Sequence, residues 1–127
     1  MEDKENPGGL SADLLRGHTE TIVLGVLLEG DAYGFEIYNR ILERSGGRYE
    51  PKEATLYSGY RRLLASGSVS SYWGDETLGA RRKYYRITEA GIRALRDNLR
   101  EWASAREIID SLLPDEVPEG KANMEEE

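Results

Sequence analysis

The fold is decided by residues 51–87, which read PKEATLYSGYRRLLASGSVSSYWGDETLGARRKYYRI. Proline is typical of the first turn of a helix and glycine of the position that ends one, so the stretch predicts a helix from Pro51 to about Ser66, stopped by Gly67. Beyond Gly67 the pattern alternates with a period of two. The alternating positions are Val69, Ser71 and Trp73 in the first run and Lys83, Tyr85 and Ile87 in the second. Because the loop at residues 74–79 is polar and bounded by glycines, the pattern predicts a β-hairpin directly after the helix.

The two faces of the predicted helix differ in character. Its apolar stripe consists of Leu56, Tyr60, Leu63 and Leu64. The opposite face carries hydroxyl, guanidinium and small side chains, namely Thr55, Ser58, Arg61, Arg62 and Ala65. Side chains of these types can read base edges in a nucleic-acid groove, but an ordinary solvated helix surface has the same composition. The face is therefore a candidate reading surface.

Two further helices are predicted upstream of this stretch. Ser11 is expected to cap the first, which ends at Gly30. Asp31 is expected to cap the second, which ends at residues 45–47. Two helices followed by a third helix and a hairpin form a winged helix-turn-helix, an α+β fold that is mainly α. The third helix of this fold enters the major groove of DNA, and the hairpin contacts phosphate or the minor groove.

The composition excludes several classes of protein. At 127 residues the chain has the length of one domain, so a second, catalytic domain is not expected. It contains no cysteine and one histidine, which argues against disulfides, thiolate metal sites and most histidine-based active sites. We therefore expect neither an enzyme nor a bound metal or cofactor. The longest apolar stretch, residues 22–28, is too short to span a membrane, and the acidic start is unlike a targeting signal, so we expect a cytoplasmic protein.

The net charge of −7 is distributed unevenly along the chain. Residues 1–13 carry −3 and residues 114–127 carry −5, which leaves residues 14–113 with +1. Within that middle part, residues 48–93 hold nine basic and five acidic side chains. The acidic total is therefore compatible with a basic surface for nucleic acid, although a solvated face without a partner shows the same excess.

A long helix is predicted after the hairpin, from the N-cap Thr88 to Leu113. Its seam positions alternate in spacings of three and four, as in a coiled coil: Ile92, Leu95, Leu99, Trp102, Ile109 and Leu113, with Arg106 as the polar member. A three-helix core cannot cover a helix of this length, so we expect a homodimer that presents two reading helices to a palindromic DNA site. The predicted organisation is a disordered acidic tail over residues 1–10, a winged-helix domain over 11–87, a dimerisation helix over 88–113 and a second disordered acidic tail over 114–127.

Three motifs resemble the PadR family of bacterial transcriptional regulators. They are EATLY at residues 53–57, SSYWGDE at 70–76 and GARRKYYRITEAG at 79–91. The resemblance covers about residues 14–113, and the short C-terminal segment is similar to that of the smaller PadR subfamily. It implies a dimeric winged helix that binds double-stranded DNA, generally represses nearby genes and releases DNA when a small effector binds.

The residues expected to contact DNA come from the third helix, its N-terminal end and the hairpin. They are Thr55, Ser58, Arg61 and Arg62 for the major groove, Lys52 and Tyr57 for flanking phosphate, and Arg81, Arg82 and Lys83 for the wing. For Tyr57, packing on the hairpin is the alternative. A rival hypothesis is a winged helix that serves only as a protein-interaction or dimerisation module, which would lack salt-dependent affinity for DNA.

The segment around Trp102 resembles the dimer helix of the multidrug-binding members of the subfamily. There a tryptophan from each subunit lines a pore at the dimer centre and stacks on planar aromatic drugs. The resemblance implies a small aromatic ligand beside Trp102, whereas the alternative is that Trp102 only fills the seam. The other expected ligand contacts are Leu95, Leu99 and Arg106 on the same helix and Leu14, Gly17 and Thr21 on the first helix. Those relatives favour an acidic group at the position of Arg106, so the guanidinium points to an anionic ligand.

Overall fold

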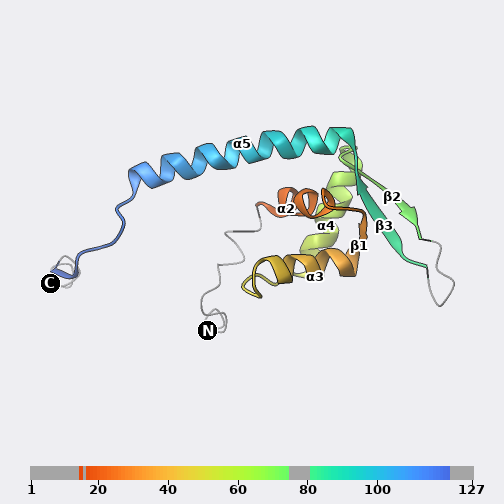
Figure 1. Ribbon diagram of the computed structural model, residues 1–127, viewed down its shortest axis with the longest axis horizontal. Coiled ribbons are helices and arrows are strands. Elements are labelled where there is room, and N and C mark those ends of the chain that lie inside the picture. Colours follow the sequence, from red (N-terminus) through yellow and green to blue (C-terminus); the bar gives the residue numbers. More distant parts are fainter. Residues whose placement is uncertain (1–14, 16, 75–80, 121–127) are drawn as a thin grey trace. The chain divides into compact units, whose positions relative to one another are not determined.

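The computed structural model describes residues 15, 17–74 and 81–120 (Figure 1). The elements are α2 Thr19–Leu27, β1 Ala32–Tyr33, α3 Gly34–Arg44, α4 Glu53–Ala65, β2 Val69–Trp73, β3 Lys83–Ile87 and α5 Glu89–Leu112. The chain divides into two compact units at the bond between Arg96 and Asp97. The predicted cap Ser11, the predicted ligand contact Leu14, the whole of the predicted tail 1–10 and half of the predicted tail 114–127 lie outside the described residues.

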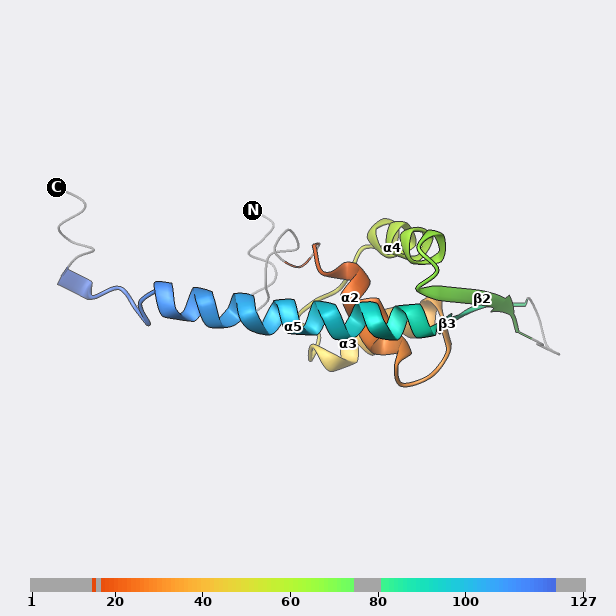
Figure 2. The same cartoon turned by 90° about the horizontal axis from the view of Figure 1, so that it is seen from above.

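Helices α2, α3 and α4 pack around one apolar core in the first unit, and the hairpin of β2 and β3 extends from one end of it (Figures 1 and 2). The core is formed by Val23, Leu24, Val26 and Leu27 of α2, Ile37 and Ile41 of α3, and Leu56, Tyr60 and Leu63 of α4, with Ala32, Val69, Tyr85 and Leu95 completing it. The predicted inward stripe of the third helix is confirmed, with Leu64 half-buried at its edge.

The end of α4 shows why the chain turns sharply into the hairpin. The N–H of Gly67 donates to the carbonyl of Leu64 at 3.1 Å, and the N–H of Ser68 donates to the carbonyl of Leu63 at 2.9 Å. This pair of bonds is the Schellman arrangement, which needs a left-handed residue after the helix. Gly67 supplies it, with a φ of 76°. The predicted glycine stop is therefore confirmed.

The sheet is antiparallel with the strand order β1-β3-β2. In the hairpin Val69 pairs with Ile87, Ser71 with Tyr85 and Trp73 with Lys83, so the side chains predicted to share one face do share it. Strand β1 was not expected from the sequence. Its two residues pair with Tyr85 and Tyr84 of β3, which joins the connection between α2 and α3 to the wing.

The prediction that Asp31 caps the second helix is wrong. Helix α3 begins three residues later at Gly34, and the N–H of Tyr33 donates to the carboxylate of Glu36 at 3.3 Å. Asp31 lies before strand β1, and its carboxylate accepts hydrogen bonds from Tyr72 and Arg86 of the hairpin. The Asp31 side chain therefore binds residues that are distant in the sequence and does not cap the helix that follows it.

The start of α5 is fixed by a close approach to the turn after α4. Thr88 is the predicted N-cap, and its Oγ1 accepts a hydrogen bond from the N–H of Gly91 at 3.1 Å. A Cβ at Gly91 would lie only 2.1 Å from the carbonyl oxygen of Ser68, so this position admits no side chain. One turn later Leu95 is buried in the core. Among the described residues, no helix has the length and apolar character that a membrane span requires.

Candidate nucleic-acid interface

The exposed face of α4 carries the side chains predicted to read DNA. Arg61 and Arg62 are exposed, whereas Thr55 and Ser58 are partly buried. The Nε of Arg62 donates to the carboxylate of Glu20 on α2. Two arginines that are equivalent in the sequence are thus unequal in the structure, because a carboxylate of the neighbouring helix already binds one of them.

The N-terminal end of α4 presents Lys52 and Tyr57, both exposed. The Tyr57 ring meets Tyr60 of its own helix edge to face, with centroids 5.9 Å apart. More than half of the Tyr57 side chain remains accessible, at 55%. Its hydroxyl therefore remains a candidate partner for phosphate.

The wing places cationic side chains against aromatic rings. Arg81, Arg82 and Lys83 are all exposed beside the loop at residues 75–80, which lies outside the described part of the chain. The guanidinium of Arg81 lies 5.7 Å from the ring centroid of Trp73, and that of Arg82 lies 4.8 Å from the ring centroid of Tyr33. Cation–π contacts of this kind orient long side chains and leave their charge exposed.

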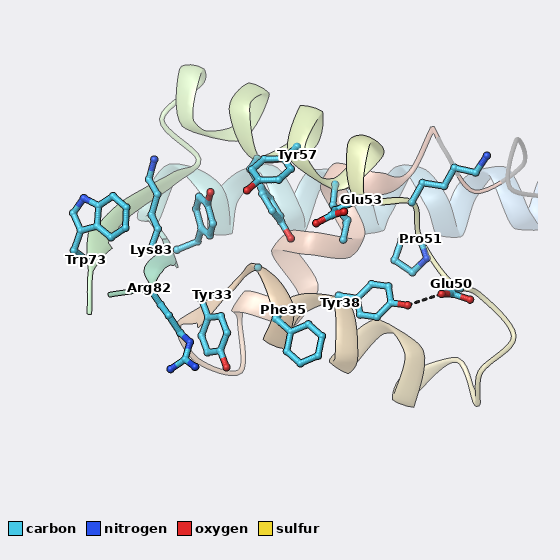
Figure 3. A pocket seen from close by; sticks show the side chains of 15 residues that line it. Tyr33, Phe35, Tyr38, Glu50, Pro51, Glu53, Tyr57, Trp73, Arg82 and Lys83 are labelled. Atoms are coloured by element: carbon cyan, nitrogen blue, oxygen red, sulfur yellow. Dashed lines mark hydrogen bonds between the residues drawn. The ribbon is translucent and has the colours of Figure 1, made fainter. Parts of the chain in front are cut away.

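A groove of about 1030 Å³ separates the wing from the N-terminal ends of α3 and α4 (Figure 3). Four of the predicted DNA contacts line it: Lys52, Tyr57, Arg82 and Lys83. The α3 side contributes Tyr33, Phe35 and Tyr38. From the sequence, Phe35 and Tyr38 are expected to contact the core from the second helix. For Phe35 that prediction is wrong, because its side chain is 63% exposed. The structure therefore brings the N-terminal end of α4 and the wing to one surface. The hydroxyl of Tyr38 donates to Glu50 at 2.5 Å, and this bond raises the pKa of Tyr38 above its ordinary value.

Asp31, before strand β1, binds both strands of the wing hairpin. Burial works against the charge of this carboxylate, but hydrogen bonds from Tyr72 at 2.6 Å and Arg86 at 3.0 Å outweigh it, and the pKa of Asp31 is lowered. The hydrogen bond between Tyr72 and Asp31 also raises the pKa of Tyr72. The Tyr72 ring also stacks on Tyr84, with centroids 5.6 Å apart. These contacts orient the strand that carries the wing cations.

The second unit carries the exposed part of the predicted dimer seam. Leu99, Trp102, Ile109 and Leu113 are exposed there, whereas Ile92 is half-buried and Leu95 fully buried in the first unit. Of the predicted ligand contacts, Trp102 and Arg106 are brought together, with the guanidinium 5.7 Å from the ring centroid. Gly17 and Thr21 belong to the first unit, where Gly17 is exposed and Thr21 half-buried.

Comparison with known proteins places this chain in a family. Residues 23–97 match the model of the transcriptional regulator PadR-like family. A protein of Lysinibacillus sphaericus, described as uncharacterized, is 43% identical over 102 residues, which cover 80% of this chain and 94% of that protein.

Solved structures agree with this placement. A transcriptional regulator from Clostridium thermocellum superposes with a TM-score of 0.76 at 41% identity, covering 83% of this chain and 99% of that one. A PadR family transcription regulator from Clostridium difficile gives 0.69 at 29% identity, covering 77% and 100%. The family match and the similarity to these solved structures, together with the winged-helix fold, show that the chain belongs to the PadR-like family of transcriptional regulators.

Proposed function

We propose that this regulator binds a palindromic operator as a homodimer and represses the adjacent genes. In each subunit α4 enters the major groove and the wing holds the flanking phosphates. The observation that supports this arrangement is the shared groove, which gathers Lys52 and Tyr57 from the start of α4 and Arg82 and Lys83 from the wing. Cations on both elements are the electrostatic requirement for such a docking.

Within α4, we assign base reading chiefly to Arg61. Arg62 is bound through its Nε to Glu20, so it presents only its terminal nitrogens to DNA. A bidentate contact to guanine needs two N–H donors aimed together at one base edge and is worth about 1–3 kcal/mol of discrimination, and the contact with Glu20 already fixes the direction of the Arg62 guanidinium. Arg62 then serves as a phosphate contact whose direction is set by α2.

The dimer rests on the apolar side chains that α5 leaves uncovered in its own subunit. Leu99, Trp102, Ile109 and Leu113 are each 44% or more exposed. Large apolar side chains at coiled-coil spacing are the normal signature of a helix that pairs with a second copy. Two-fold pairing spaces the reading helices by about one turn of DNA, roughly 34 Å, and so selects a palindrome.

Release of DNA is assigned to a small aromatic effector beside Trp102. The support is the exposed indole with Arg106 over its ring, a pairing that accepts planar rings and favours an anionic substituent. Leu99 lies on the same exposed stripe, whereas Leu95 is already packed inside its own subunit and contributes only through the core.

The test is fluorescence anisotropy with duplex DNA from upstream of the protein's own coding region, beside a scrambled duplex, at several salt concentrations. We expect preferential, salt-sensitive binding by two subunits per site. Arg61→Ala should lower the preference for the operator by about tenfold or more. The matched control is Arg93→Ala, which removes an exposed arginine at the start of α5 and should keep the preference.

Equal affinity of the wild type for both duplexes, extended to genomic selection that recovers no sequence, would refute the proposal. It would favour the protein-interaction module instead. Retained discrimination in an Arg61→Ala, Arg62→Ala double variant would move base reading away from α4.

A further inference from the structure

The groove between the wing and the starts of α3 and α4 has the lining of a small-molecule site. Seven of its lining residues are aromatic: Tyr33, Phe35, Tyr38, Tyr57, Tyr60, Trp73 and Tyr85. Phe35, Tyr57 and Trp73 keep 63%, 55% and 55% of their side chains exposed. The groove volume of about 1030 Å³ is at the upper end of the usual range for ligand sites. Exposed rings that converge from three elements provide stacking surfaces for a planar molecule.

One polar group on this lining lacks a partner. Tyr60 is 4% exposed, and among the described residues its hydroxyl is buried without a hydrogen bond. Its ring is held by Tyr85, with centroids 4.7 Å apart, and by Tyr57. A buried hydroxyl without a partner destabilises the fold, so its retention is explained if a ligand completes the bond. Burial raises the pKa of Tyr60, which keeps the hydroxyl protonated and able to donate.

The Tyr60 hydroxyl lies at the wall of the groove, covered by its neighbours. Gly34 is one of them, and a Cβ built there would touch the Tyr60 oxygen at 4.0 Å, so the absence of a side chain at Gly34 keeps this wall thin. Tyr57 packs against the Tyr60 ring and is more than half exposed, and exposed side chains change rotamer on the picosecond to nanosecond scale. We therefore expect a change of the Tyr57 rotamer to accompany the approach of a ligand to the Tyr60 hydroxyl.

The charges on the lining fix the orientation of the ligand. Arg82 and Lys83 stand at the wing end, whereas Glu50 and Glu53 stand at the opposite end (Figure 3). Lys52 also lines the groove. Glu50 already accepts the Tyr38 hydroxyl. An anionic group is attracted to the wing end and repelled from the carboxylates, so a ring between Tyr57 and Trp73 would direct its charge toward Lys83.

We propose that this groove binds a planar aromatic ring that bears an anionic group, stacked on the groove rings and hydrogen-bonded to Tyr60. The inference rests on the proposed function, because the ligand would use cations that are assigned there to phosphate. Ligand and operator would then exclude each other directly. This mode of control acts at the reading surface and is separate from an effector beside Trp102 on α5.

The first experiment is isothermal titration calorimetry on the full chain with three probes: 2-naphthoate, its neutral analogue 2-naphthalenemethanol, and adenosine monophosphate. At least one anion should bind saturably in the groove, at one groove per subunit, and 2-naphthoate should bind there about tenfold tighter than the alcohol. Tighter binding of naphthoate assigns an aryl carboxylate, and tighter binding of the nucleotide assigns a base with phosphate. No saturable binding of either anion, or equal binding of the alcohol and naphthoate, would overturn the proposal.

Two matched aromatic variants locate the ligand. Tyr60→Phe keeps the ring and removes the hydroxyl, so it should weaken the bound anion by about fivefold or more while operator affinity stays unchanged, because Tyr60 is too buried to reach DNA. The matched control is Tyr49→Phe, at a tyrosine that does not line the groove, and it should leave the anion affinity unchanged. Trp102→Phe shows whether the same probe is bound on α5 instead. The reverse result, with sensitivity at Trp102 and none at Tyr60, would place the ligand on α5 and overturn the groove site.

Competition between the anion and operator DNA tests whether the two exclude each other. The apparent Kd for operator DNA should rise in proportion to the concentration of the bound anion, without a plateau. A plateau or no effect would overturn mutual exclusion. If the wild type binds no DNA selectively, the proposed function fails, and the calorimetry with Tyr60→Phe still decides whether the groove holds the ligand.

Discussion

The carboxylate of Asp31 accepts a hydrogen bond from the hydroxyl of Tyr72 at 2.6 Å, across 41 residues of chain. Asp31 stands before the two-residue strand β1, and Tyr72 stands in the wing strand β2. Arg86 of β3 reaches the same carboxylate at 3.0 Å and lies 5.1 Å from the centroid of the Tyr72 ring. This cluster ties the wing to the helix-turn-helix, so the position of the wing cations depends on a residue that makes no predicted DNA contact.

The first prediction concerns this cluster of Asp31, Tyr72 and Arg86, which anchors the wing. Asp31→Asn keeps the shape and removes the charge, and should lower the free energy of unfolding by about 1 kcal/mol. It should also weaken operator binding by about threefold, since the wing must then be ordered on binding. Urea unfolding and anisotropy measure the two effects. The control is Asp97→Asn, because Asp97 is exposed and pairs across a helix turn with Arg100, so both quantities should stay at wild-type values.

The anchor also makes stability depend on pH. The pKa of Asp31 is lowered below its ordinary value of 3.8, so the folded state binds this proton less readily than the unfolded state. Its stabilising contribution is complete above the unfolded pKa and is lost as the pH falls through the lower folded pKa. The difference in unfolding free energy between wild type and Asp31→Asn should therefore be constant from pH 7 to about 5 and shrink toward pH 3. If the difference in unfolding free energy between wild type and Asp31→Asn instead grew on acidification, the pKa of Asp31 would be raised by folding and not lowered.

How far the sequence predicts this molecule depends on whether a feature is local. Helix α4 and the hairpin were predicted because proline, glycine and the change of period act within a few residues, as the Gly67 turn shows. Strand β1 was missed because two residues carry no periodicity, and Asp31 was misassigned because its partners are 41 and 55 residues away. The pairing of Arg62 with Glu20, 42 residues apart, is invisible for the same reason.

The aromatic groove illustrates the limit for the site. Its cationic members were predicted, since clustered arginine and lysine are visible in the sequence. Phe35 and Tyr38 were predicted to contact the core and Tyr33 was given no role in the site, because the spacing of an aromatic residue does not distinguish a buried ring from one that lines an open groove. Only the close packing of three elements brings these rings together.

A third prediction uses the contact at the start of α5. Gly91→Ala places a methyl group 2.1 Å from the Ser68 carbonyl, so the helix must move from the core, and the free energy of unfolding should fall by about 3 kcal/mol or more. The control is Gly25→Ala in α2, where nothing lies within 4 Å of the new methyl and helix propensity favours alanine by about 1 kcal/mol. Urea unfolding should show opposite signs for the two variants, and a shared sign would contradict the account of Gly91.

A fourth prediction compares two tyrosine hydroxyls. Tyr60→Phe removes a buried hydroxyl that has no partner, so the free energy of unfolding should stay constant or rise by up to about 1 kcal/mol. Tyr72→Phe removes the donor to Asp31 and should lower the free energy of unfolding. Thermal and urea unfolding of both variants give the comparison. Clear destabilisation by Tyr60→Phe would show that its hydroxyl has a bound partner in solution without added ligand.

The last prediction concerns the apolar stripe of α5. Ile109→Asp introduces a charge at a predicted seam position that is 49% exposed in its own subunit, so it should barely change the folding of the winged helix. Between two subunits the same charge would be buried against apolar side chains, and dimerisation should weaken by about a hundredfold or more. Ser104→Asp adds an equal charge at an exposed position of the same helix outside the seam, and should leave the dimer intact. Sedimentation velocity across a dilution series measures both. Because two linked half-sites bind DNA far more tightly than one, Ile109→Asp should also reduce operator affinity while a single half-site duplex binds as before.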